Sequence, residues 1–182
     1  EMSKIQKALN PLCSPHIVIT AIEEADGQFN ARFSAKNRTY RYQVLNQVHP
    51  DPFLSRYSWH VRAPISIERM NTAGQELVGE HDFSSFCRKN IIEINGEQVH
   101  ASLTREVTSL RWDTAESNLL ELWITANAFC HQMVRSITGT LVDIGVGKLD
   151  ERSMEEILEG RHRNLAGQVA PPHGLTLWNV GY

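Results

Sequence analysis

The chain has 182 residues, of which 41% are hydrophobic and 21% charged, and its formal net charge at pH 7 is −3. This length and apolar content predict a globular protein with a sizeable core, and no segment approaches the roughly 18 apolar residues of a membrane span. The negative net charge excludes a uniformly basic surface, so any binding of nucleic acid requires a local patch. Three widely spaced cysteines, Cys13, Cys87 and Cys130, predict free thiols in a reducing compartment, and therefore a cytoplasmic protein.

The first predicted element is the end of an amphipathic helix over residues 1–9. Four residues should break it, Asn10, Pro11, Ser14 and Pro15, because proline lacks a backbone N–H and clashes with the preceding helical turn. Residues 17–25 are rich in β-branched side chains and predict a strand, which a turn at residues 26–27 closes. The start at Glu1, without an initiator methionine, indicates a piece cut from a longer protein.

The next predicted strand covers residues 38–46, where side chains alternate strictly between two faces. Tyr40 and Tyr42 share one face, and Arg41 lies on the other. Any function of Tyr40 is therefore displayed on a defined surface of a sheet. A short strand near Trp59 is expected to follow.

A helix over residues 67–78 is predicted, because Ser66 is a suitable N-cap and a glycine follows the last turn. Residues 103–113 and 119–125 predict two strands of one long hairpin. Between this helix and this hairpin, the composition predicts a polar loop around a small aromatic island, formed by Phe83 and Phe86.

Asn127 is positioned to cap the next helix. The expected buried stripe of this helix comprises Phe129, Met133, Ile137, Leu141 and Ile144. A short helix capped by Asp150 and an alternating strand over residues 175–182 complete the chain. Strands mixed with a few helices, without an internal repeat, predict an α+β fold with a mixed, largely antiparallel sheet flanked by helices.

The most informative segment is ITANAFCHQMVRSITGTLVDIGVG, residues 124–147, because it sets Arg135 among small and apolar side chains. A guanidinium in that setting needs an anion or a planar acceptor to offset its desolvation. The residues alone leave an alternative open, in which Arg135 forms a structural salt bridge with Glu121 or Asp143.

A local basic patch lies between residues 32 and 50, which include four basic side chains and no acidic one: Arg32, Lys36, Arg38 and Arg41. Charge runs of this kind are usually a solvated face. In a protein that binds the phosphate backbone of an RNA stem, the same residues would contact the phosphates.

Four segments resemble the tRNA pseudouridine synthase A family of bacteria. They are FNARFSAKNRTYRYQV (residues 29–44), GEHDFSSF (79–86), ITANAFCHQMVRSITGTLVDIGVGK (124–148) and PPHGLTLWNVGY (171–182). They occur in the family's order across nearly the whole chain, which makes the resemblance specific where each segment alone would be modest.

The resemblance implies a pseudouridine-synthase-like fold and isomerisation of uridine to pseudouridine in the anticodon stem-loop of tRNA, at positions 38–40. It implies tRNA as partner, a homodimer, and no metal or organic cofactor. The family's catalytic aspartate belongs to a Gly-Arg-Thr-Asp-Ala-Gly motif that this sequence lacks, so the chain is expected to be inactive alone. Residues 1–30 then correspond to a remnant of the N-terminal half, and residues 31–182 to the C-terminal catalytic-face domain with its tRNA-binding sheet.

Residue by residue, the resemblance assigns two catalytic roles. Tyr40 matches the active-site tyrosine that packs against the target base, and Arg135 matches the arginine that pairs with the catalytic aspartate. Leu175 and Leu177 would wall the pocket, and the basic patch would contact RNA.

Competing interpretations are a core role for Tyr40, a tRNA-binding module without chemistry, and a metal-dependent hydrolase. The last would use Cys13 with His16 and Cys130 with His131, but this spacing is unlike that of zinc sites. The neighbouring His81 and Asp82 are expected to belong to a structural loop.

Overall fold

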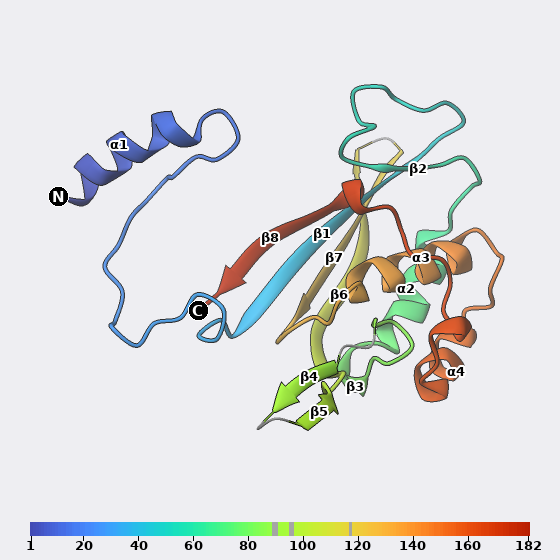
Figure 1. Ribbon diagram of the computed structural model, residues 1–182. Helices are drawn as coiled ribbons and strands as arrows, with labels where there is room; N and C mark the ends of the chain where they lie inside the picture. The colour runs from blue at the N-terminus through green and yellow to red at the C-terminus, as the bar shows by residue number, and fades with distance from the viewer. Residues whose placement is uncertain (89–90, 95–96, 117) are drawn as a thin grey trace. The chain divides into compact units, whose positions relative to one another are not determined.

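The computed structural model of the chain describes residues 1–88, 91–94, 97–116 and 118–182, with backbone only for residues 91–94 and 97–100 (Figure 1). It contains two compact units, residues 1–34 and residues 35–182. Each helix of the described residues is too short or too polar to cross a lipid bilayer.

The first unit contains helix α1 (Met2–Cys13), which continues through Asn10 and Pro11 and ends just before Ser14. The predicted break is therefore wrong for Asn10 and Pro11 and agrees with the helix end at Ser14 and Pro15. Pro11 lies in the last turn, where the loss of one helical hydrogen bond costs little because the helix ends two residues later. The predicted strand over residues 17–25 is also wrong. There the Asn10 side chain binds both backbone groups of Ile19: Oδ1 accepts from its N–H at 2.7 Å, and Nδ2 donates to its carbonyl at 3.1 Å. These side-chain bonds replace the partners that a strand would need.

The second unit is built on one sheet whose strands run in the order β2-β1-β7-β6-β3, with β8 pairing β1 (Figure 1). The strands are β1 (Asn37–Asn46), β2 (Trp59–Val61), β3 (Gly79–Asp82), β6 (Thr104–Glu116), β7 (Leu119–Ala126) and β8 (Leu175–Gly181). Only the β1–β2 pair of this sheet is parallel among the described pairings. The predicted α+β fold with a largely antiparallel sheet is therefore confirmed.

Three helices of this unit lie beside the sheet: α2 (Ile67–Gln75), α3 (Met133–Gly145) and α4 (Ser153–Gly160) (Figure 1). Two 3₁₀ turns follow them, η1 (Arg163–Leu165) and η2 (Pro172–Gly174). Ser66 caps α2 as predicted, because its hydroxyl accepts the N–H of Arg69 at 3.3 Å.

The core lies between the sheet and the helices α2 and α3. Fully buried side chains include Tyr42 and Val44 from β1, Leu122 and Ile124 from β7, Met70 from α2, and Met133, Ile137, Leu141 and Ile144 from α3. Four of the five residues of the predicted stripe are therefore in α3 and fully buried. Phe129 is only partly buried and precedes the helix.

The start of α3 differs from the prediction. Asn127 does not cap the helix, because its Oδ1 accepts the N–H groups of Glu106 at 3.1 Å and Ala128 at 2.6 Å. The helix begins only at Met133, after Gln132 in a left-handed conformation with φ 68°. Asp150 likewise binds the N–H of Arg152 at 3.0 Å, in the turn before α4. Asn127 therefore binds strand β6 and Ala128, and Asp150 stabilises the turn before α4.

The segment predicted as a polar loop contains strands instead. Strand β3 pairs with β6, and β4 (Ile91–Ile94) with β5 (Glu97–His100) forms a separate two-stranded sheet. The predicted aromatic island is present, since Phe83 and Phe86 are fully buried with ring centroids 6.2 Å apart.

Candidate active site

Tyr40 and Arg135 meet in one pocket of about 320 Å³. The pocket lies where the middle of β1, the start of β8, the first turn of α3 and the loop before that helix come together. Its lining residues are Tyr40, Phe129, Cys130, His131, Gln132, Val134, Arg135 and Leu175. Two residues that are 95 positions apart in sequence are thus brought to one concave surface, as a ligand site requires.

Arg135 is oriented by the backbone of Ala170. Its Nε donates to the Ala170 carbonyl at 2.6 Å, and the Ala170 N–H donates to the Arg135 carbonyl at 3.0 Å. The terminal nitrogens of the guanidinium are a planar fork suited to a carboxylate. The alternative of a salt bridge is not realised, because Glu121 pairs with Arg41 at 3.3 Å and Asp143 with Lys148 at 3.2 Å.

Gly139 allows the segment of residues 168–171, called the strap below, to pack closely against α3. A Cβ at this position would collide with the carbonyl oxygen of Gln168 and would lie only 3.2 Å from the N–H nitrogen of Ala170. Because both neighbours are backbone atoms, neither can rotate away. The absence of a side chain at Gly139 is therefore a condition for the bonds between Arg135 and Ala170.

Tyr40 is partly buried and packs edge-on against Phe129, with ring centroids 5.2 Å apart and an interplanar angle of 88°. The pairing of β1 with β8 shifts register between Thr39 and Tyr40, which places Leu177 opposite Tyr40. A bulge of this kind redirects side chains at the point where it occurs. The aromatic pair forms one apolar wall of the pocket.

Tyr42 supports the site from within the core, a role that the sequence analysis did not identify. It is fully buried, and its hydroxyl donates to the Pro171 carbonyl at 2.7 Å. Burial raises the pKa of Tyr42 above its ordinary value, and the positive charge of Arg135 acts in the opposite direction. Two neighbouring residues of the strap are thus bound, Pro171 by Tyr42 and Ala170 by Arg135. The Tyr-x-Tyr pattern could have indicated this role of Tyr42, because alternate residues of a strand share a face and Tyr42 therefore lies on the same face as Tyr40.

The two leucines differ in position. Leu175 lines the pocket, whereas Leu177 is 50% exposed and is not among the lining residues. Leu177 therefore contributes to the strand next to Tyr40 and not to the pocket wall.

The basic patch is distributed over different environments. Arg32 belongs to the unit of residues 1–34, and Lys36 is exposed at the start of the second unit. Arg38 donates to the carbonyls of Ala35 at 3.1 Å and Asn127 at 2.8 Å. Arg41 is the most engaged member: besides its pair with Glu121, it lies 4.6 Å from the ring centroid of Trp178. The three patch residues of the second unit thus differ in their exposure and in their partners.

The cysteines correct the prediction of three free thiols. Cys87 and Cys130 form a disulfide with their Cα atoms 5.7 Å apart, and Cys13 is free. The prediction failed because spacing in sequence does not reveal which cysteines the fold brings together. Within the described part of the chain, no three His, Cys, Asp or Glu residues are grouped as metal ligands.

Comparison with known proteins identifies the family. A family model described as tRNA pseudouridine synthase matches residues 73–182. Similar proteins include tRNA pseudouridine synthase A of Bacillus velezensis and of Bacillus subtilis, which are 40% and 39% identical to the chain over 175 residues. The chain belongs to the tRNA pseudouridine synthase family. Both matches cover 96% of this chain and 68% of the relative.

A further relative, tRNA pseudouridine synthase A 2 of Bacillus cereus, is 36% identical over 179 residues, covering 98% of this chain and 70% of its own length. These matches confirm the resemblance drawn from the four segments. Of the candidate residues, Arg135, Leu175 and Leu177 lie inside the region that the tRNA pseudouridine synthase model matches, and Tyr40 precedes it.

Proposed function

We propose that the chain provides the catalytic face of an isomerase that converts uridine to pseudouridine in tRNA, at positions 38–40 of the anticodon stem-loop. The observation that carries this proposal is the meeting of Tyr40 and Arg135 in one pocket of a member of the tRNA pseudouridine synthase family. Both are residue types that the reaction needs, and both line the pocket.

The reaction explains these residue types. The bond between C1′ and N1 of uridine breaks, the uracil turns, C1′ bonds to C5, and the proton of C5 is lost while N1 gains one. A carboxylate takes part as nucleophile or base. Arg135 would keep that carboxylate ionised and oriented, because an adjacent guanidinium favours the charged form. The base must first leave the stack of the stem-loop, and the ring of Tyr40 would pack against it in the pocket.

The catalytic carboxylate has no counterpart among the described residues that line this pocket. The motif Gly-Arg-Thr-Asp-Ala-Gly does not occur in the 182 residues. Asp82 does not replace it, because its carboxylate accepts the Ser84 N–H at 3.0 Å, lies 3.6 Å from Arg161, and is not part of the pocket lining. The missing motif equally favours the second candidate function, a tRNA-binding module without chemistry.

One comparison separates the two functions. This chain and the product of its complete open reading frame are each tested for tRNA binding and for pseudouridine formation. The isomerase proposal expects binding by both proteins and turnover only where a Gly-Arg-Thr-Asp motif is encoded. Binding without turnover by the complete product would establish the binding module instead.

We further propose that Lys36 and Arg38 contact RNA phosphates, with Arg32 and Arg41 as weaker candidates. Lys36 is exposed, and Arg38 is only two residues from the pocket tyrosine Tyr40 on the same strand. Arg41 already binds Glu121 and an aromatic ring, so a phosphate would compete with these partners.

Three remaining features rest on the family alone: a cytoplasmic location, a homodimer, and chemistry without metal or organic cofactor. Light scattering of the complete product tests the dimer. Turnover after dialysis against a chelator tests the independence from metal, and loss of activity that added metal restores would exclude this part of the proposal.

A further inference from the structure

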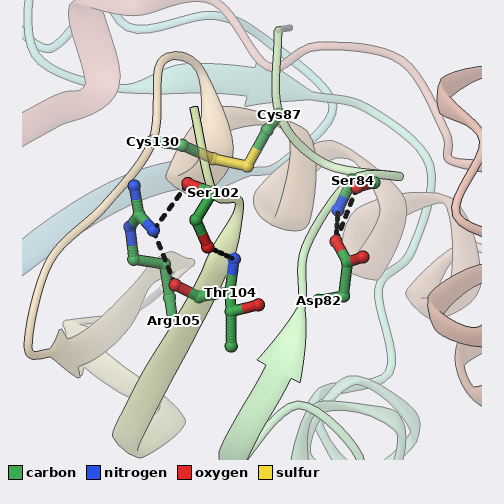
Figure 2. The surroundings of a disulfide bond; sticks show 7 residues. All are labelled: Asp82, Ser84, Cys87, Ser102, Thr104, Arg105 and Cys130. Carbon is green, nitrogen blue, oxygen red and sulfur yellow. Dashed lines mark hydrogen bonds between the residues drawn. A yellow bond between two sulfur atoms is a disulfide. The ribbon is translucent and has the colours of Figure 1, made fainter. Parts of the chain in front are cut away.

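The disulfide joins two segments with different environments (Figure 2). Cys87 follows the aromatic island, and Cys130 lies in the pocket loop, residues 129–132. A backbone hydrogen bond from the Arg88 N–H to the His131 carbonyl, at 3.0 Å, holds the same two segments together beside the disulfide. The two cysteines are thus held close by the fold and not by the disulfide alone.

Cys87 is fixed and buried. Its side chain is 2% exposed, next to the fully buried Phe86, and the Ser85 hydroxyl donates to the Ile157 carbonyl at 2.5 Å. Figure 2 shows the disulfide joining Cys87, in the segment that follows Asp82, to Cys130, with Ser102 and Arg105 in its surroundings. A thiol at position 87 can reach the sulfur of Cys130, but little solvent reaches it.

Cys130 is partly exposed and lines the pocket, which Arg135 lines as well. Partly exposed cysteines in electropositive surroundings react, whereas buried cysteines are inert. Cys130 is accessible to a small oxidant, as an attacking cysteine must be. Cys87 is within reach of the oxidised Cys130 sulfur, as a resolving cysteine must be.

We propose that Cys130 is an oxidation site for small hydroperoxides, and that Cys87 is its resolving partner. The Cys130 thiolate attacks the peroxide, the O–O bond breaks, and a sulfenic acid and one water or alcohol form. The Cys87 thiolate then attacks the Cys130 sulfur, the S–O bond breaks, and a disulfide and one water form. Two thiols lose two electrons and two protons in total, and the peroxide takes up both. A cellular thiol reverses the reaction by exchange.

The pair matters because of what a lone cysteine would become. Without a resolving partner, further oxidation gives a sulfinic or sulfonic acid, which is irreversible in most proteins. That anion would lie in the same pocket as Arg135, and it would compete with the catalytic carboxylate for the guanidinium. This consequence for turnover rests on the proposed function, whereas the oxidation chemistry does not. The disulfide leaves no new charge in the pocket.

Peptide mass mapping of this chain after hydrogen peroxide treatment tests the chemistry directly. We expect a linked pair of peptides containing Cys87 and Cys130, which dithiothreitol separates. In Cys87→Ser and Cys87→Ala we expect the Cys130 peptide to gain about 32 Da or more, irreversibly. Cys13→Ser is the matched control and should behave as the wild type.

Two results would overturn the proposal: a wild-type protein that never forms the linked peptides, or Cys87 variants in which Cys130 is oxidised no further than in the wild type. Using two variants at Cys87, each checked by circular dichroism, separates a chemical effect from misfolding. The turnover of the complete product provides the functional readout. Peroxide followed by dithiothreitol should leave wild-type turnover within about twofold of its starting value and lower that of Cys87→Ser at least about tenfold. Turnover that recovers equally in both would reject the protective role, and an absence of turnover in every untreated protein would instead count against the proposed function.

Discussion

Arg135 and Ala170 bind each other through two hydrogen bonds, the side-chain Nε to the Ala170 carbonyl at 2.6 Å and the Ala170 N–H to the Arg135 carbonyl at 3.0 Å. This pairing uses the nitrogen of the guanidinium nearest to the chain, the Nε, on a side chain that lines the pocket. The strap that carries Ala170 is also bound by Tyr42. The position of the arginine is therefore determined by the packing of the strap on α3, and not by the helix alone.

Arg135→Lys should abolish most turnover of the complete product while tRNA affinity changes less than about threefold. A lysine keeps the charge but loses both the planar fork and the bond to Ala170, and loss of a group that acts on a developing charge costs about 100-fold or more in kcat. Arg69→Lys is the matched control, since Arg69 also donates to a backbone carbonyl, that of Leu149, outside the pocket. Equal losses of turnover and of binding would contradict the assigned role.

Tyr40→Phe should retain turnover within about threefold, because the edge-on packing against Phe129 does not involve the hydroxyl. Tyr40→Ala should lose about 1–3 kcal/mol of base stacking, which corresponds to roughly 5- to 150-fold in turnover. Single-turnover assays of both variants measure this difference. Complete loss of activity in the phenylalanine variant would assign proton transfer to the hydroxyl instead.

Gly139→Ala should destabilise the second unit by about 1–3 kcal/mol, measured by urea denaturation. Alanine is favoured over glycine in a helix by up to about 1 kcal/mol, but the new Cβ collides with the backbone of residue 168, so the steric term prevails. Gly27→Ala is the control, because a Cβ there meets nothing within 4 Å. Unchanged stability in Gly139→Ala would show that the strap can shift without cost.

The free energy of unfolding should decrease above about pH 10, because Tyr42 is buried with its hydroxyl protonated. Its folded-state pKa is raised above the ordinary value of 10.0, so the unfolded chain releases the proton first and is favoured as the pH rises. The contribution is fully present below pH 10 and declines by about 1.4 kcal/mol per pH unit above it. The free energy of unfolding, measured by urea denaturation at several pH values between about 8 and about 11, should fall less steeply with pH for Tyr42→Phe than for the wild type. Parallel curves would place the titrating group elsewhere.

Neutralising Lys36 and Arg38 together should weaken tRNA binding and flatten its dependence on salt. Each lost phosphate contact lowers the slope of log K against log salt by about 0.7–0.9. Arg111→Gln with Arg161→Gln removes the same charge from two surface ion pairs and serves as the control. If both double variants shift the slope equally, the effect is one of net charge and not of specific contacts.

Local sequence patterns predicted several elements well, each for a local reason. Strand β1 and the β6–β7 hairpin follow from alternation of side chains, and Ser66 caps α2 because its hydroxyl needs a partner only three residues away. The same local reasoning failed for Asn127. Its side chain found a distant partner, the N–H of Glu106 on a neighbouring strand.

The sequence by itself determined the fold class, the main strands and, through the four family segments, the identity of Tyr40 and Arg135 as candidates. Only the tertiary structure decided which groups hold Arg135, that Tyr42 binds the strap, and that Cys87 and Cys130 form a pair. Periodicity and capping depend on residues within a few positions of each other, so they can be recognised along the chain. The partners of a buried arginine, tyrosine or cysteine come from segments tens of residues away, and they are selected by the packing of helices on the sheet.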